Sequence, residues 1–292
     1  MLTEQRNPKT QNLDQLSTLE ILQTINEEDQ KVALIVREVI PQIALAVDAV
    51  STAFANGGRL IYVGAGTSGR LGVLDAVECI PTYSTPPGQV MGLLAGGERA
   101  MTASIERAED KPENGANDLR AANLTATDVV VGIAASGTTP YVVGALMYAN
   151  EVGSVSVAIS CNSPAPILDV ASIKIPLPVG PEVVTGSTRM KAGTAQKLVL
   201  NMLSTASMVR SGKVYGNLMV DVQVVNEKLE RRARRIIREM TGVDDTEADD
   251  LLKAAGNNVK TAIAMRRRNV DAARARELLR EANGHLRKVI DE

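Results

Sequence analysis

The sequence predicts an α/β fold, with a doubly wound parallel sheet flanked by helices and a small C-terminal helical domain. The strand-like runs are continuously apolar, which is typical of strands that are buried on both faces. Each run is followed by a glycine- or hydroxyl-rich loop and then a helical pattern, as in doubly wound folds. The C-terminal stretch has helical patterns only. The predicted strands are residues 59–64, 90–96, 128–136, 154–161 and 173–179.

Long helical patterns surround these strands. Residues 14–56 are predicted to be helical, and Ser17 with Glu20 matches a capping box near the start of this stretch. The other two long patterns cover residues 192–208 and 217–241, the second of which ends at Gly242.

The character of the chain changes after Gly242. Residues 243–292 hold three short helical patterns, and Thr246 with Asp249 is the expected cap of the first. We therefore expect two domains, one of residues 1–242 and a small helical one of residues 243–292.

Composition and charge narrow the function class. The net charge of −2 and the pI near 5.7 argue against a general nucleic-acid binder. The basic run 231–235 has acidic residues four positions earlier, which is typical of a solvated helix face. Cys79 and Cys161 are expected to be buried reduced thiols, and a single histidine, His285, argues against a histidine metal site.

No membrane or targeting segment is predicted. The N-terminal residues are polar and lack the apolar region of a signal peptide. The long uncharged run 129–149 is interrupted by Ser136–Pro140, so it is better explained as a strand, a loop and a helix. We expect a cytoplasmic protein.

The loop Gly64–Gly69 matches the G-x-G-x-x-G pattern of dinucleotide-binding proteins. The acidic residue that would grip a ribose, Glu98, arrives about ten residues late for that role. The loop instead places the hydroxyls of Thr67 and Ser68 beside backbone N–H groups at the start of a helix. Such a terminus attracts anions through its dipole and its unpaired donors.

The same chemistry recurs after two further strands, in Ser136–Thr139 and Thr185–Thr188. Ligands of doubly wound folds bind at the carboxyl ends of the strands, where these loops lie. Three hydroxyl-rich loops that converge there favour one compact anion, so the sequence predicts a site for a phosphate monoester such as a sugar phosphate.

Several acidic residues are candidates for proton transfer. Apolar neighbours around Glu78 are expected to raise its pKa, as in a general acid. Glu106 and Asp110 would share one helix face, whereas Glu109 would point elsewhere. The sequence pattern alone does not show which of Glu106, Glu109 and Asp110 is catalytic. The simplest interpretation of any one of them is a solvated surface carboxylate.

Four stretches closely resemble the N-acetylmuramic acid 6-phosphate etherases of the sugar isomerase (SIS) fold group, and the similarity covers nearly the whole chain. The most specific is the block 180–197. The others are residues 64–79, 131–142 and 211–221. The resemblance implies an SIS-type sheet and cleavage of the D-lactyl ether of N-acetylmuramic acid 6-phosphate, in the recycling of bacterial cell-wall sugars. It implies no metal and no organic cofactor.

Roles for individual residues follow from the resemblance. Glu78 would protonate the departing lactate and then activate water, and Glu109 would remove the C2 proton. Arg189 and Lys191 are possible cationic partners of the phosphate, although either could pair with Glu182 instead. The residues expected to bind the sugar phosphate are Gly66, Thr67, Ser68, Ser136, Gly137, Thr138, Ser187, Thr188 and Lys191.

The same fold serves two other functions. One is a sugar-phosphate sensor like the glucokinase regulator, but the retained Glu78 and Glu109 favour an enzyme. The other is an aldose–ketose isomerase, but His285 lies outside the predicted sheet. Proteins of this fold usually form homodimers, and the apolar helices at 32–56 and 192–209 are the predicted surface. No nucleic-acid or membrane partner is expected.

Overall fold

The computed structural model describes residues 1–291. The chain divides into two compact units. The first contains Met1–Ala76 and Gly88–Ser204, and the second contains Val77–Pro87 and the chain from Thr205 onward. Two helices, α4 (Gly66–Tyr83) and α8 (Lys191–Arg210), begin in the first unit and end in the second.

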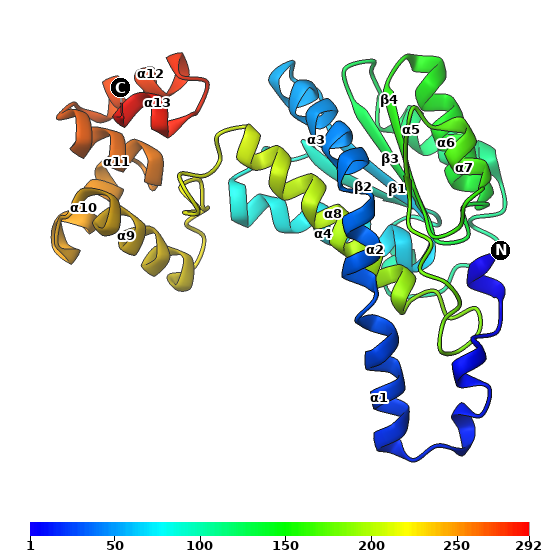
Figure 1. Cartoon of the computed structure of the whole chain (residues 1–292). Coiled ribbons are helices and arrows are strands. Elements are labelled where there is room, and N and C mark those ends of the chain that lie inside the picture. Colours follow the sequence, from blue (N-terminus) through cyan, green and yellow to red (C-terminus); the bar gives the residue numbers. More distant parts are fainter. Residues whose placement is uncertain (292) are drawn as a thin grey trace. The chain divides into compact units, whose positions relative to one another are not determined.

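The core of the first unit is a five-stranded parallel sheet in the order β2-β1-β3-β4-β5 (Figure 1). Every residue of β1 and β3 is buried, as the continuous apolar runs predicted. The chain changes direction across the sheet between β1 and β3, which pair side by side. In doubly wound folds such a switch point is where ligands bind. The strands are β1 (Leu60–Gly64), β2 (Val90–Leu94), β3 (Val129–Ala134), β4 (Val155–Ser160) and β5 (Ile173–Pro176).

Helices cover both faces of this sheet, which confirms the doubly wound arrangement (Figure 1). One face packs against α5 (Pro112–Ala121), α6 (Pro140–Val152) and α7 (Pro166–Val170), with Ile61 and Val63 of β1 in this core. The other face packs against α3 and the first part of α4, where Gly72 lies against Tyr62. Among the described residues, no helix has both the length and the apolar character needed to span a membrane.

The predicted helix over 14–56 is three helices: α1 (Thr18–Asp29), α2 (Val32–Glu38) and α3 (Ile40–Ala55). The capping box is confirmed, because Ser17 and Glu20 bond each other's backbone N–H groups. Pro41 marks the second break, since proline has no N–H to continue the hydrogen bonds of α2. Short 3₁₀ helices precede α1 at Leu2–Glu4, Pro8–Thr10 and Leu13–Gln15, and another, Glu98–Met101, follows β2.

The second unit has its own helical core. Its helices are α9 (Glu227–Thr241), α10 (Asp245–Ala254), α11 (Val259–Arg268), α12 (Ala272–Glu281) and α13 (Leu286–Ile290). Buried residues of α9, including Ile236 and Ile237, belong to the same core as those of the later helices. The expected boundary after Gly242 therefore falls inside this core rather than at its edge.

Three predictions for this region were wrong in detail. The charged helix begins at Glu227 rather than at residue 217, because Asn226 accepts a hydrogen bond from the N–H of Leu229 at 2.9 Å and caps it. Asp244, not Thr246, caps the next helix by accepting from the N–H of Glu247 at 2.9 Å. Residues 243–291 hold four short helices, because α13 follows the break at 283–284.

The basic run on α9 is a paired helix face, as predicted. Arg231 lies 3.1 Å from Glu227 and Arg234 lies 3.7 Å from Glu230, each pair four residues apart.

Candidate active site

The first hydroxyl loop joins β1 to α4 at the switch point. Gly66 has a φ of +52°, and a Cβ on Gly69 would lie 2.5 Å from the carbonyl oxygen of Gly64, so the loop closes tightly on the strand. Ser68 is buried in the first turn of α4, where backbone N–H groups have no partner within the helix. Its Oγ donates to Oε1 of Gln196 on α8 at 2.9 Å.

The second loop follows β3, the neighbour of β1. Gly137 has a φ of +73°, and a Cβ there would lie 2.4 Å from both Ala165 Cβ and Ser160 Oγ. Ser136 Oγ accepts hydrogen bonds from the N–H and the Oγ1 of Thr138, at 3.2 and 3.1 Å. The Ser136 hydroxyl hydrogen is therefore available to an external acceptor. The structure brings these two predicted loops to the same edge of two adjacent strands.

The third loop, after β5, reaches the first one. A Cβ on Gly193, at the start of α8, would lie 3.5 Å from Thr67 Cγ2 and 3.7 Å from the carbonyl oxygen of Thr188. Ser187 and Thr188 are half-buried, and Thr185 is exposed. The end of this loop and the start of α4 thus lie together, as the sugar-phosphate prediction requires.

The buried side chain of Asn162 holds the second loop through hydrogen bonds to its backbone. Asn162 Nδ2 donates to the carbonyl oxygens of Ala135 and Ser136 at 3.0 and 3.2 Å. Its Oδ1 accepts from the N–H groups of Leu2 and Thr3 at 2.6 and 3.3 Å. The N-terminal segment is thereby fastened to the loop that carries Ser136.

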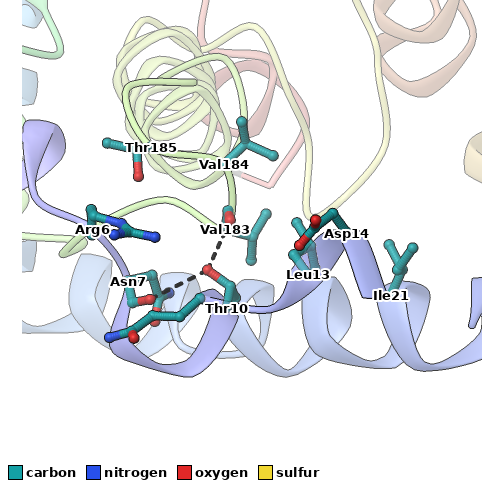
Figure 2. Close-up of a pocket in the computed structure, with 10 residues that line it drawn as sticks. Arg6, Asn7, Thr10, Leu13, Asp14, Ile21, Val183, Val184 and Thr185 are labelled. Carbon is teal, nitrogen blue, oxygen red and sulfur yellow. Dashed lines mark hydrogen bonds between the residues drawn. The ribbon is translucent and has the colours of Figure 1, made fainter. Parts of the chain in front are cut away.

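The same N-terminal segment lies against the third loop. Thr10 Oγ1 donates to the carbonyl oxygen of Val183 at 2.9 Å, and Asn7 Nδ2 donates to that of Pro181 at 3.3 Å. A cavity of about 390 Å³ lies between them, and Figure 2 shows the residues that line it, among them Arg6, Asp14 and Thr185. The N-terminal segment therefore supports two of the three loops.

Lys191 differs from its prediction as a phosphate ligand. Its side chain is 3% exposed, and its Nζ lies 2.5 Å from Oε2 of Glu28, which also pairs with Lys31. Glu182 is buried as well, but it accepts from the backbone N–H groups of Lys191 and Ala192 and so caps α8. Separating a buried ammonium from its carboxylate would leave an uncompensated charge, so Lys191 has a structural role. Arg189, in contrast, is exposed on the loop.

This buried pair makes stability sensitive to acid. Burial alone would raise the pKa of Glu28, but hydrogen bonds from Lys191 and Lys31 outweigh it and lower the pKa from 4.5 to about 2. Because the folded-state pKa lies below the ordinary value, the stabilisation is present above pH 4.5 and is lost as the pH falls toward 2. Urea unfolding across this range should show the loss.

The matched variant for this titration is Glu28→Gln. It should lower the free energy of unfolding at neutral pH by about 3 kcal/mol, because a buried ammonium loses its counter-charge. It should also flatten the decline of that free energy with falling pH. Glu38→Gln, which breaks an exposed pair with Arg37, should change it by less than about 0.5 kcal/mol. An unchanged pH dependence in Glu28→Gln would contradict this assignment.

Glu78 lies on α4 in the second unit. The apolar enclosure expected around it is absent, since Glu78 and its neighbour Val77 are both exposed on this helix. The buried acid of the segment is Asp75, which sequence reasoning missed. Burial raises the pKa of Asp75, although it accepts hydrogen bonds from Tyr62 at 2.8 Å and Asn201 at 2.7 Å. These bonds tie α4 to β1 and α8.

Glu109 lies in the first unit, in an exposed stretch of turns. The expected helical pairing of Glu106 with Asp110 is wrong, because Arg107 between them has a φ of +56°. The carbonyl oxygen of Glu109 accepts from the N–H of Tyr141 at 3.0 Å. Its backbone is thus held at the start of α6, directly after the loop of Ser136.

Both cysteines are buried thiols, as predicted. Burial raises the pKa of Cys161 to about 12, so this thiol stays protonated at neutral pH. In residues 1–291 no group of three or more His, Cys, Asp or Glu side chains is arranged to hold a metal ion.

Sequence reasoning also missed Gln196 and Asn162, the partners of the first two loops. Both side chains are polar and buried, and polar neighbours in the sequence, such as Lys197 beside Gln196 and Ser163 beside Asn162, give no signal of that burial. Neither contact could be located from spacing alone.

Family models and solved structures support the fold. Residues 42–150 match the N-terminal SIS domain of glucokinase regulatory protein, and residues 216–276 match the C-terminal lid domain of the same protein. A phosphoheptose isomerase from Francisella tularensis is similar in structure, with a TM-score of 0.55 at 16% identity. The match covers 66% of this chain and 100% of that one, and it indicates the fold alone.

Curated relatives match the whole chain. An N-acetylmuramic acid 6-phosphate etherase from Vibrio vulnificus (strain YJ016) is 57% identical over 292 residues, which is 100% of this chain and 97% of the relative. One from Actinobacillus pleuropneumoniae serotype 5b (strain L20) is 56% identical over 290 residues, 99% of this chain and 95% of the relative. These matches confirm the resemblance seen in the sequence, and the chain belongs to the N-acetylmuramic acid 6-phosphate etherase family.

Proposed function

We propose that this protein cleaves the D-lactyl ether of N-acetylmuramic acid 6-phosphate with water, giving N-acetylglucosamine 6-phosphate and D-lactate. The observation that carries the proposal is the full-length identity of 57% to a curated etherase. The three hydroxyl loops, which follow β1, β3 and β5, supply the hydrogen-bond donors that such a substrate needs.

Binding of the phosphate group positions the sugar in the site. Ser68, Ser136 and Thr138 supply hydroxyl donors, and backbone N–H groups in the loops around Gly66 and Gly137 add further donors to the anion. Thr67, Ser187 and Thr188 complete the same cluster of loops. Arg189, exposed at the edge of this cluster, is the remaining cationic candidate.

The chemistry is an elimination followed by a hydration. An alkyl ether is a poor leaving group, but the open-chain aldehyde acidifies the proton at C2. Glu109 removes that proton, the electron pair forms the double bond between C2 and C3, and the C3–oxygen bond breaks. Glu78 protonates the departing lactate oxygen. Water then adds at C3, with Glu78 taking its proton, and C2 is reprotonated to give the product.

The protein acts as a homodimer in the cytoplasm, where the reaction serves the recycling of peptidoglycan sugars. Apolar side chains exposed on α2 and α3 support a surface for a second copy of the chain. Leu34 is 56% exposed, Ile40 46% and Leu45 60%. These helices lie in one of the segments for which the sequence predicted the dimer contact.

Release of D-lactate tests the proposal. The purified protein should release D-lactate from N-acetylmuramic acid 6-phosphate. The sugar without its phosphate should react roughly a thousandfold less efficiently, because several charge-assisted hydrogen bonds are lost. Binding of the phosphorylated sugar without release would favour a sensor. Conversion of an aldose phosphate to a ketose phosphate would favour an isomerase.

A further inference from the structure

Two buried polar groups meet at the start of α4. Ser68 is 7% exposed and Gln196 is fully buried, and the Ser68 hydroxyl donates to Gln196 Oε1 at 2.9 Å. The other end of the same amide, Nε2 of Gln196, is buried and makes no hydrogen bond. A buried N–H group without an acceptor is rare and costly.

This arrangement also withholds the donor that a phosphate needs. A serine hydroxyl has one hydrogen, and here it is given to the amide of Gln196. Ser68 therefore cannot donate to a phosphate oxygen while this bond exists. A half-turn of the amide removes both problems, because Nε2 then donates to Ser68 Oγ and the serine hydrogen is released.

Ser136 in the neighbouring loop already has a hydroxyl hydrogen that its partner does not use. Its Oγ accepts two hydrogen bonds from Thr138, so its own hydrogen is available to a ligand. The two serines stand at adjacent strand ends, but the partner of Ser68 accepts its hydrogen whereas the groups bonded to Ser136 donate to it. Turning the amide of Gln196 would make the partner of Ser68 a donor as well.

We propose that Gln196 is a positioning residue that directs the Ser68 hydroxyl to the phosphate of the bound sugar. In the ligand-bound state Gln196 Nε2 donates to Ser68 Oγ, and Ser68 donates to a phosphate oxygen. The turned amide leaves an oxygen rather than an N–H without a partner, which costs less. The inference rests on the proposed function, since it assumes that a sugar phosphate occupies these loops.

Binding rather than turnover tests this role. Calorimetry with N-acetylglucosamine 6-phosphate should give a dissociation constant for Gln196→Glu about tenfold to a hundredfold above that of the parent. An ionised carboxylate only accepts, so it holds the Ser68 hydrogen permanently. Ser68→Ala should weaken binding similarly, and the double variant should bind no more weakly than Ser68→Ala alone.

A pH series separates this role from a packing role. A protonated carboxyl group can donate to Ser68 as the amide does. The ratio of the Gln196→Glu dissociation constant to that of the parent should therefore shrink as the pH falls. Gln196→Met, of similar volume, neither holds the hydrogen nor directs it, so it should weaken binding less than Gln196→Glu does. If Gln196→Glu does not fold, Gln196→Met and its double variant with Ser68→Ala provide the same coupling test.

Three results would overturn the inference. The first is a parent that binds the sugar phosphate and a Gln196→Glu variant that binds it equally well, which leaves the proposed function intact. The second is an equal loss on adding Gln196→Glu to the parent and to Ser68→Ala, which would indicate direct repulsion of the phosphate. The third is a parent that binds no sugar phosphate, which would defeat the proposed function as well.

Discussion

Glu78→Gln is expected to reduce D-lactate release by about 10²- to 10⁴-fold. A glutamine amide cannot protonate the departing lactate oxygen, and it cannot accept a proton from the water that adds at C3. Because Glu78 is exposed, the substitution should change the free energy of unfolding by less than about 0.5 kcal/mol. Steady-state release of D-lactate, with thermal unfolding measured beside it, checks both expectations.

Exchange of the C2 proton assigns the two glutamates separately. In heavy water, Glu78→Gln should still exchange the C2 proton of the substrate, because Glu109 performs that step. Glu109→Gln should lose the exchange and the release together. Glu106→Gln is the matched control, since Glu106 lies in the same exposed stretch and has no assigned role. Full D-lactate release by Glu78→Gln would contradict the assignment of the acid.

Gly137→Ala is expected to disrupt the phosphate loop. The new Cβ would lie 2.4 Å from Ala165 Cβ and Ser160 Oγ, at a φ of +73°. Overpacking costs about 1–3 kcal/mol and the left-handed conformation about 1–2 kcal/mol, so the loop should shift and carry Ser136 and Thr138 with it. We expect a KM for the sugar phosphate at least about tenfold higher, together with a lower melting temperature.

Gly57→Ala isolates the cost of the backbone conformation. Gly57 has a nearly identical φ of +75°, and no other atom lies within 4 Å of the position of its Cβ. It should lose only about 1–2 kcal/mol of stability and keep the parental KM. A Gly137→Ala variant no more affected than Gly57→Ala would show that the loop tolerates the extra atom.

The strands were predictable because burial on both faces leaves a local signature. All five apolar runs contain strands, and the hydroxyl loops follow β1, β3 and β5 as expected. The order of the strands was not predicted, because it depends on pairings such as Leu60 with both Val90 and Val129, which lie far apart in the sequence.

Helix boundaries were harder to predict than helices. The apolar pattern continues through the break between α2 and α3, although Pro41 marks it. The charged helix was predicted to begin at residue 217, and only the structure shows that Asn226 caps it and that it begins at Glu227. The charged stretch around Arg107 resembles a helix, but its backbone forms turns there.

The hydroxyl loops of the site could be predicted from neighbouring residues, but the residues that hold these loops in place come from distant parts of the sequence. Hydroxyls next to glycines at strand ends are visible in the sequence. Gln196 contacts Ser68 across 128 residues, and the partner of Lys191, Glu28, lies 163 residues away. The charge of Lys191 was therefore predicted to bind the phosphate, whereas in the structure it pairs with Glu28.

The etherase account is tested most directly by the fate of the ether oxygen. The protein would be incubated with N-acetylmuramic acid 6-phosphate in water enriched in heavy oxygen, and both products would be analysed by mass spectrometry. Elimination and hydration predict the label in the C3 hydroxyl of N-acetylglucosamine 6-phosphate and none in the lactate hydroxyl. Label in the lactate hydroxyl, or no D-lactate at all, would contradict the account.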